Sequence, residues 1–243
     1  RQLLLAGAWG ALPPLAVNGA FDARRNRSQL SPAALASRWA SVIESCKASL
    51  PALRMLLRLS EAWQWPDEQQ QVLEAITRDF AGESWTWRRL ISQALVRGET
   101  EELWQVYQRW SRAAPGDTTV QIEAAIMGHL LQKSGAPSSS STSAWVQRQP
   151  AAPGAVVAHA LALWRGQRLA EALALLGTLR AEAFAEPRYA LAYGLMLSEA
   201  GRARESEPLL NRASAERMLP DEMLLIEQAR ARNQPRLSGS RQP

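Results

Sequence analysis

The stretch YGLMLSEAGRARESEPLLNRASAERMLP, residues 193–220, decides the fold of this chain because part of it recurs upstream. Residues 201–206 read GRARES, and residues 167–172, which lie 34 positions earlier, read QRLAEA with arginine and glutamate at matching places. A self-similarity of this length that begins each cycle at a turn is typical of stacked helix pairs. The sequence therefore predicts a helical repeat protein, which works by presenting a surface.

Prolines follow the same period. Pro66 follows Pro32 by one full period, and each is predicted to open a helix, since the first helical position does not need a backbone N–H. Further prolines recur between later repeats and are predicted to end helices: Pro115, Pro153, Pro187 and Pro220.

Composition agrees with an all-α fold. Apolar residues make up 47% of the 243 positions, which is enough to bury a core, and alternating β-branched runs are almost absent. Periodicity and helix-breaking residues then place the helices. They are predicted at about 12–26, 32–48, 51–62, 66–79, 84–97, 100–112, 118–133, 155–165, 168–180, 187–200, 203–216 and 220–232.

One segment interrupts the pattern. Ser134 to Ser143 reads SGAPSSSSTS, and this composition predicts either a flexible loop or a helix shortened to about Ser143 to Gln149. The chain is accordingly divided into less regular repeats at 1–133, the interruption at 134–152, better preserved repeats at 153–232 and a disordered tail at 233–243. The helix from 220 to 232 is expected to cap the array.

The best-preserved unit carries a family resemblance. Its large and small residues stand at the spacing of one known motif: Tyr193-Gly194, Leu197, Gly201-Arg202, Glu205-Ser206, Leu210 and Ala213. This pattern resembles the tetratricopeptide repeat (TPR), in which a turn glycine follows the small residue of the first helix by seven positions. The preceding unit matches with its glycine displaced by one, at Gly166. Earlier units keep the period and lose most of the small residues.

The resemblance implies an α-solenoid of antiparallel helix pairs, a TPR-like superhelix. It implies a non-enzymatic scaffold that binds a protein or peptide on its concave face, without a cofactor or metal. The heavy use of arginine over lysine is typical of a GC-rich genome, and the resemblance is to bacterial TPR-like proteins. A start at Arg1, without methionine, indicates a fragment of a longer protein.

Ten tryptophans are the second informative feature. Most are interpreted as fillers between helix layers, but Trp63 with Trp65, and Trp85 with Trp87, are two residues apart and should point in different directions. One member of each pair could therefore face a binding groove. The repeats between Leu53 and Trp110 are favoured for specific binding, and side chains on the first helix of each pair are chosen as groove candidates: Trp87, Arg88, Gln121, His159, Arg188 and Glu199.

Motifs for chemistry are not found in the sequence. The two histidines, His129 and His159, lie far apart along the chain and lack the spacing of metal ligands, and no phosphate-binding or nucleophile motif occurs. Carboxylates such as Asp67 and Glu68 fall at predicted helix starts, where they complement the helix dipole. An enzyme, a cofactor and a metal site are therefore not expected.

Two alternative functions remain open. A net charge of +5 and the aromatic content would suit an RNA-binding helical repeat, although the arginines are interleaved with Asp and Glu along the chain. A membrane-tethered adaptor with an anchor upstream of Arg1 is the other alternative. The apolar stretch from Leu3 to Phe21 is long enough to cross a bilayer, but Pro13 and Pro14 favour a helix, a turn and a second helix. Localisation is cytoplasmic or membrane-tethered in these interpretations.

Overall fold

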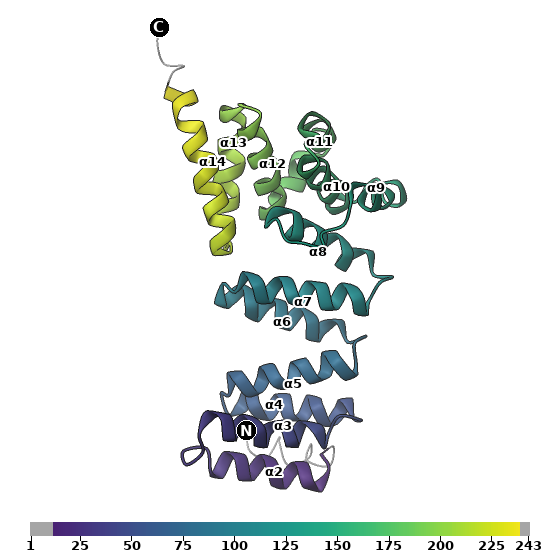
Figure 1. Cartoon of the computed structure of the whole chain (residues 1–243), viewed down its shortest axis with the longest axis vertical. Helices are drawn as coiled ribbons and strands as arrows, with labels where there is room; N and C mark the ends of the chain where they lie inside the picture. The colour runs from purple at the N-terminus through teal and green to yellow at the C-terminus, as the bar shows by residue number, and fades with distance from the viewer. Residues whose placement is uncertain (1–11, 239–243) are drawn as a thin grey trace. The chain divides into compact units, whose positions relative to one another are not determined.

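A computed structural model describes residues 12–238, and every regular element in that range is helical (Figure 1). The all-α prediction is confirmed, and consecutive helices pack against each other. The helices are α2 (Pro14–Arg25), α3 (Pro32–Glu44), α4 (Leu50–Ala62), α5 (Pro66–Asp79), α6 (Ser84–Arg97), α7 (Thr100–Ala113), α8 (Thr118–Leu130), α9 (Ser139–Arg148), α10 (Pro153–Arg165), α11 (Leu169–Leu176), the 3₁₀ turn η2 (Ala181–Ala185), α12 (Pro187–Glu199), α13 (Ala203–Ser214) and α14 (Pro220–Ser238).

The repeat is visible in where helices begin. The first helices of the pairs from α4 onward start at residues 50, 84, 118, 153, 187 and 220, so every interval lies within one position of the period found in the sequence. The chain divides into two compact units, residues 1–92 and 93–243. This division falls inside α6, whereas the sequence placed a boundary after residue 133.

From α4 onward, each turn from a first helix to its second helix has the same backbone geometry. One residue adopts a left-handed conformation, and the amide of the next residue donates to a carbonyl five positions back, as Arg202 N–H does to Leu197 at 2.9 Å. This hydrogen bond is the Schellman ending of a helix. The left-handed residues keep the period of the repeat: Gln64 (φ 58°), Gly98 (φ 73°), Gln132 (φ 52°), Gln167 (φ 63°) and Gly201 (φ 80°).

The glycine that is displaced in the unit before Gly201 is explained by this turn. Gln167, and not Gly166, takes the left-handed conformation, and Gly201 follows Gln167 by one full period. Glutamine rarely adopts positive φ, because its Cβ approaches the backbone. The sequence pattern of glycines therefore concealed a turn that the backbone repeats.

Substitutions at two of these turns are expected to have opposite effects. Gly201→Val should lower the free energy of unfolding by about 2 kcal/mol, because a branched side chain is strained at φ 80°. Gln167→Gly should raise it by up to about 1 kcal/mol, because strain at φ 63° is relieved. Chemical denaturation checks both values. Gly116→Val is the control, since an added Cβ there meets open space; an equal loss at Gly116 and Gly201 would contradict the turn assignment.

The predicted helix-ending prolines do the opposite of what was expected. Pro153, Pro187 and Pro220 each occupy the first position of a helix, namely α10, α12 and α14. The prediction that they end helices was wrong, because proline lacks only an N–H that has no partner at this position. The helix limits predicted at 187 and 220 nevertheless match the starts of α12 and α14. Pro115 does lie between helices, in the connection from α7 to α8.

The serine-rich segment forms a helix. α9 starts at Ser139, four residues earlier than the shortened helix expected from the sequence, and Ser138 Oγ accepts the amide of Ser141 as a cap. Thr142 is buried, with its hydroxyl 3.0 Å from His159 Nδ1 on α10. A helix therefore replaces the expected loop from Ser139 onward, since serine hydroxyls supply the cap that begins a helix, while residues 134–138 stay in the connection from α8.

The C-terminal helix is longer than predicted. α14 continues to Ser238, so the expected disordered tail cannot begin at residue 233; residues 239–243 lie outside the described part. Asn233 is fully buried, its amide nitrogen donates to Ser206 Oγ at 3.3 Å, and its side-chain oxygen accepts from Ser198 Oγ at 2.9 Å. These hydrogen bonds hold the end of α14 on α12 and α13.

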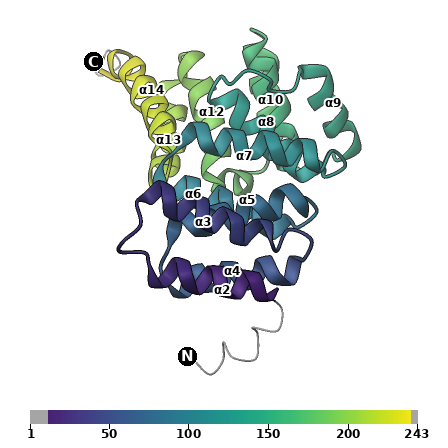
Figure 2. The same cartoon turned by 60° about the horizontal axis from the view of Figure 1, so that its bottom comes forward.

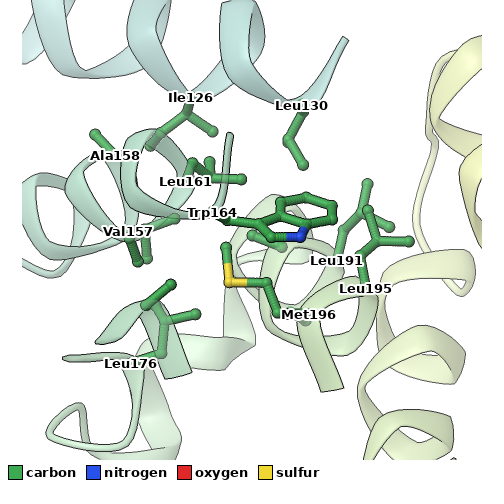
Figure 3. Close-up of a cluster of buried hydrophobic side chains, with 14 of the residues drawn as sticks. Ile126, Leu130, Val157, Ala158, Leu161, Trp164, Leu176, Leu191, Leu195 and Met196 are labelled. Carbon is green, nitrogen blue, oxygen red and sulfur yellow. The ribbon is translucent and has the colours of Figure 1, made fainter. Parts of the chain in front are cut away.

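The core of the second unit is built mainly from the first helices of successive pairs, with residues of α11, η2 and α13 packed against them. Figure 3 shows the Trp164 indole from α10 lying among Leu161 of the same helix and Leu191, Leu195 and Met196 of α12. The indole nitrogen leaves this apolar cluster and donates to Glu199 at 2.9 Å. The buried indole and its satisfied N–H therefore join α10 to α12.

None of the helices between residues 12 and 238 has the length and apolarity of a membrane span. The predicted apolar stretch from Leu3 to Phe21 is described only from Leu12 onward, where α2 begins at Pro14. The part of this stretch before Leu12, with Trp9, lies outside the described residues.

Candidate functional site

The two groove candidates of the first unit differ in exposure. Arg88 is exposed on α6, whereas Trp87 is 3% exposed and donates its indole N–H to the Ala81 carbonyl at 2.9 Å. Trp87 is therefore a packing residue, and the expectation that it lines an open groove is not met. Sequence spacing alone did not show that Trp87 would be buried and the adjacent Arg88 exposed.

The four candidates of the second unit all have internal partners. Gln121 donates to the Ser111 carbonyl at 2.8 Å and so ties α8 to the end of α7. His159 contacts Thr142 of α9, and Glu199 accepts from Trp164. Arg188 pairs with the buried Glu222 of α14 at 2.6 Å. These side chains join neighbouring helices, and the structure does not gather them into one site.

Both histidines, at 129 and 159, have pKa values below the ordinary value of 6.5, and burial is the first cause in each case. Arg165 lowers the pKa of His129 further, and Arg168 that of His159. The unfolded chain therefore takes up protons first as pH falls. The second unit should be fully stable above about pH 6.5 and lose stability below it, so its thermal midpoint should drop between pH 7.5 and pH 5.5.

The control for this pH dependence is the double variant His129→Gln, His159→Gln. It removes both histidines of the chain, so its thermal midpoint should change less over the same pH range, where ordinary carboxylates stay ionised. A drop as large as that of the unmodified protein would assign the effect to other groups.

Tryptophans form a cluster in the first unit, in which α2 to α5 lie side by side in Figures 1 and 2. The tryptophan cluster is Trp39 of α3 with Trp63 and Trp65 of the α4–α5 turn. The Trp39 ring lies 6.4 Å from that of Trp63 and 5.8 Å from that of Trp65, both at edge-to-face angles. Gln64 between the last two is the left-handed residue of the turn, so its geometry directs both rings toward α3.

The members of each tryptophan pair are unequally buried. Trp65 and Trp87 are buried, while Trp63 and Trp85 are partly exposed. Arginines lie over the rings: Arg24 is 5.1 Å from the Trp63 centroid, and Arg27 is 4.2 Å from the Trp65 centroid. Cation–π contacts at these distances fix the end of α2 against the cluster.

A cleft opens beside the tryptophan cluster, between α3 and α5. Its volume is about 480 Å³. We call it the α3–α5 cleft, and it is lined by Arg27, Leu30, Pro32, Ala33, Leu35, Ala36, Asp67, Glu68 and Gln71. One wall, formed by Leu30 and α3, is apolar, and Arg27 adds a guanidinium beside it. The other wall is the first two turns of α5 and carries carboxylate and amide oxygens.

Glu68 is the unusual residue of this cleft. It is 4% exposed, and its Oε2 has no hydrogen-bond partner. The nearest cation is Arg27, whose Nη1 is 3.6 Å from Oε2, which is an ion-pair distance and too long for a hydrogen bond. A buried acceptor without a partner is costly, so it needs a physical explanation.

Asp67 and Gln71 extend the same wall. Asp67 is exposed and Gln71 partly exposed, and the described residues supply no hydrogen bond to either side chain. In the sequence, Asp67 and Glu68 were interpreted only as carboxylates at the start of a helix. Nothing in the local sequence showed that α3 would cover Glu68 and leave a cleft beside it, because that depends on the packing of helices that begin one repeat apart.

Among residues 12–238, no group of three His, Cys, Asp or Glu side chains is placed to hold a metal ion. In comparisons with known proteins, the chain matches no family model and no curated protein sequence.

Proposed function

We propose that this chain is a non-enzymatic scaffold that binds a protein or peptide partner on the surface of its helical repeats. The TPR resemblance of residues 193–220 suggests this mode of action. The observation that carries it is the α3–α5 cleft, which lies beside the tryptophan cluster and has a buried carboxylate whose Oε2 accepts no hydrogen bond.

Physical chemistry supports this use of the cleft. Specific interfaces concentrate their binding free energy in a few aromatic and arginine side chains next to a pocket. Trp63 is partly exposed with Arg24 over its ring, and Trp39 and Trp65 hold it rigidly from behind. A rigid aromatic group loses little conformational entropy when a partner covers it.

The experiment is selection of a displayed random peptide library on the intact chain. We expect enriched peptides that bind with micromolar dissociation constants and bind Trp63→Ala about tenfold more weakly. The matched control is Trp85→Ala, which removes another partly exposed tryptophan covered by an arginine, Arg54. Failure to enrich any peptide, or equal binding by both variants and the unmodified protein, would contradict the proposal for this surface.

The RNA-binding alternative predicts a different result. Phosphate contacts would make affinity for labelled single-stranded RNA fall by orders of magnitude from low to moderate salt. The two carboxylates of the cleft, on Asp67 and Glu68, oppose polyanion binding there. We expect the selected peptides to bind and the RNA not to bind at moderate salt; the reverse would favour the alternative. The membrane-tethered adaptor remains a prediction about sequence upstream of Arg1, which the complete reading frame would test.

A further inference from the structure

We propose that the α3–α5 cleft receives a lysine side chain from the partner. This inference rests on the proposed function and names the chemistry that the cleft would recognise. The aliphatic stem of the lysine would lie on the apolar wall, and its ammonium group would meet the oxygens of α5.

The apolar wall suits an aliphatic stem. Leu30, Pro32, Ala33 and Ala36 line it, and two of them are alanines, which leave space above the helix. Lysine buries its methylene chain along such surfaces while its charged head stays near polar groups. A volume of about 480 Å³ accommodates this side chain together with part of the backbone that carries it.

The opposite wall suits the head group. Gln71 follows Asp67 by four positions and Glu68 by three on α5, so its side chain lies next to both on the helix surface. An ammonium group has three donors and needs acceptors from several directions. Glu68 Oε2 is an acceptor that still lacks a hydrogen-bond partner, and Asp67 and Gln71 offer further oxygens at the mouth.

Charge decides against other ligands. The lining has two carboxylates and one guanidinium, which leaves one negative charge uncompensated. Arg27 is shared between the Trp65 ring, at 4.2 Å, and the Glu68 carboxylate, at 3.6 Å, and it makes no hydrogen bond to that carboxylate. Phosphate and carboxylate ligands would be repelled. An arginine of the partner would present a planar guanidinium, which pairs best with one carboxylate through two parallel hydrogen bonds. The cleft instead offers acceptors on three side chains, those of Asp67, Glu68 and Gln71.

Arg27 also provides a way into the site. Its side chain is 40% exposed, whereas that of Glu68 is 5% exposed. The Arg27 Nη1 beside Glu68 is buried and makes no hydrogen bond, so displacing it toward solvent would break only the ion pair and would uncover Glu68 Oε2. The backbone of α5 and the indole of Trp39, which donates to the Glu68 carbonyl at 3.2 Å, need not move.

The test compares two displayed libraries with identical random flanks, one with lysine and one with leucine fixed at the centre. The intact chain should enrich the lysine library. The best lysine peptide should bind Glu68→Gln about tenfold more weakly, which is the size of one well-placed charge pair. Glu182→Gln is the matched control, since it removes an exposed carboxylate on η2 and should bind unchanged.

A double-mutant cycle makes the assignment specific. The peptide with norleucine in place of lysine should bind weakly and equally to the unmodified protein and to Glu68→Gln. The ¹⁵N–¹H resonance of the Trp39 indole should shift with the lysine peptide, because that N–H is bonded to the Glu68 carbonyl. Thermal melting of each variant shows that it is folded.

Each outcome has a defined meaning. Enriched peptides whose binding is indifferent to lysine, or is equally weakened by both glutamine variants, would overturn this inference and leave the peptide-binding proposal standing. Tighter binding by a glutamine or glutamate peptide than by the lysine peptide would also overturn it, in favour of a neutral or anionic ligand. If neither library is enriched, both proposals fail.

Discussion

Trp39→Ala is expected to lower the free energy of unfolding of the first unit by about 3–5 kcal/mol, which is the usual cost of removing a buried aromatic ring. Trp39 is fully buried and lies against the rings of both Trp63 and Trp65. Its indole N–H donates to the Glu68 carbonyl at 3.2 Å, so the substitution removes packing and a link between α3 and α5. The cavity would lie beside the α3–α5 cleft.

Chemical denaturation followed by circular dichroism measures this loss. Trp39→Phe should cost less, because most of the ring contact is kept and only the N–H is lost. Trp85→Ala is the control for loss of a tryptophan outside the cluster. It should lower the free energy of unfolding by about 1 kcal/mol, since that ring is partly exposed. Similar midpoints for Trp39→Ala and Trp85→Ala would show that the tryptophan cluster is not the core of this unit.

Glu222→Ala is expected to destabilise the second unit by about 3 kcal/mol, because it leaves Arg188 without its buried partner. Glu222 is fully buried, accepts from Arg188 at 2.6 and 3.3 Å, and also accepts the Leu219 amide at 2.8 Å. The pair joins α12 to the start of α14. The lower end of the usual range applies, because the Arg188 side chain is 21% exposed.

Two variants separate the charge pair from a general effect at the start of α14. Asp221→Ala removes an exposed carboxylate one residue earlier and should cost less than about 1 kcal/mol. The double variant Arg188→Leu, Glu222→Ala should recover part of the loss, since no unpaired charge remains. A double variant that is less stable than Glu222→Ala alone, by the full cost of Arg188→Leu, would show that the two residues act independently.

The repeat period was sufficient to place almost every helix. Helix starts at Pro32, Pro66, Pro187 and Pro220 agree with the sequence to the residue, because proline is compatible with the first helical position wherever it occurs. The start of α9 was not predicted. The serine-rich composition of this segment indicates flexibility, but the Ser138 hydroxyl caps the helix, and Thr142 contacts His159 of α10.

The candidate site was much less predictable. Trp87 and Arg88 are adjacent in sequence, yet Trp87 is buried and Arg88 is exposed. Burial depends on which face of α6 packs against neighbouring helices, and the sequence does not give that face. Arg188 was chosen as a groove residue because it lies on a first helix. Instead, it forms an ion pair with Glu222, which belongs to the next repeat. A full repeat separates the members of such a pair, so no local pattern reveals it.

By itself, the sequence determined the helical class, the repeat length and the approximate limits of the helices, because these depend on local propensity and on a period that survives divergence. Tertiary structure alone decided which side chains remain available. It turned Gln64, Gln132 and Gln167 into left-handed turn residues, and it buried Glu68 beside an open cleft without a hydrogen-bond partner for Oε2. The physical reason is that burial and pairing are set by neighbours one repeat away, where packing outweighs local preference.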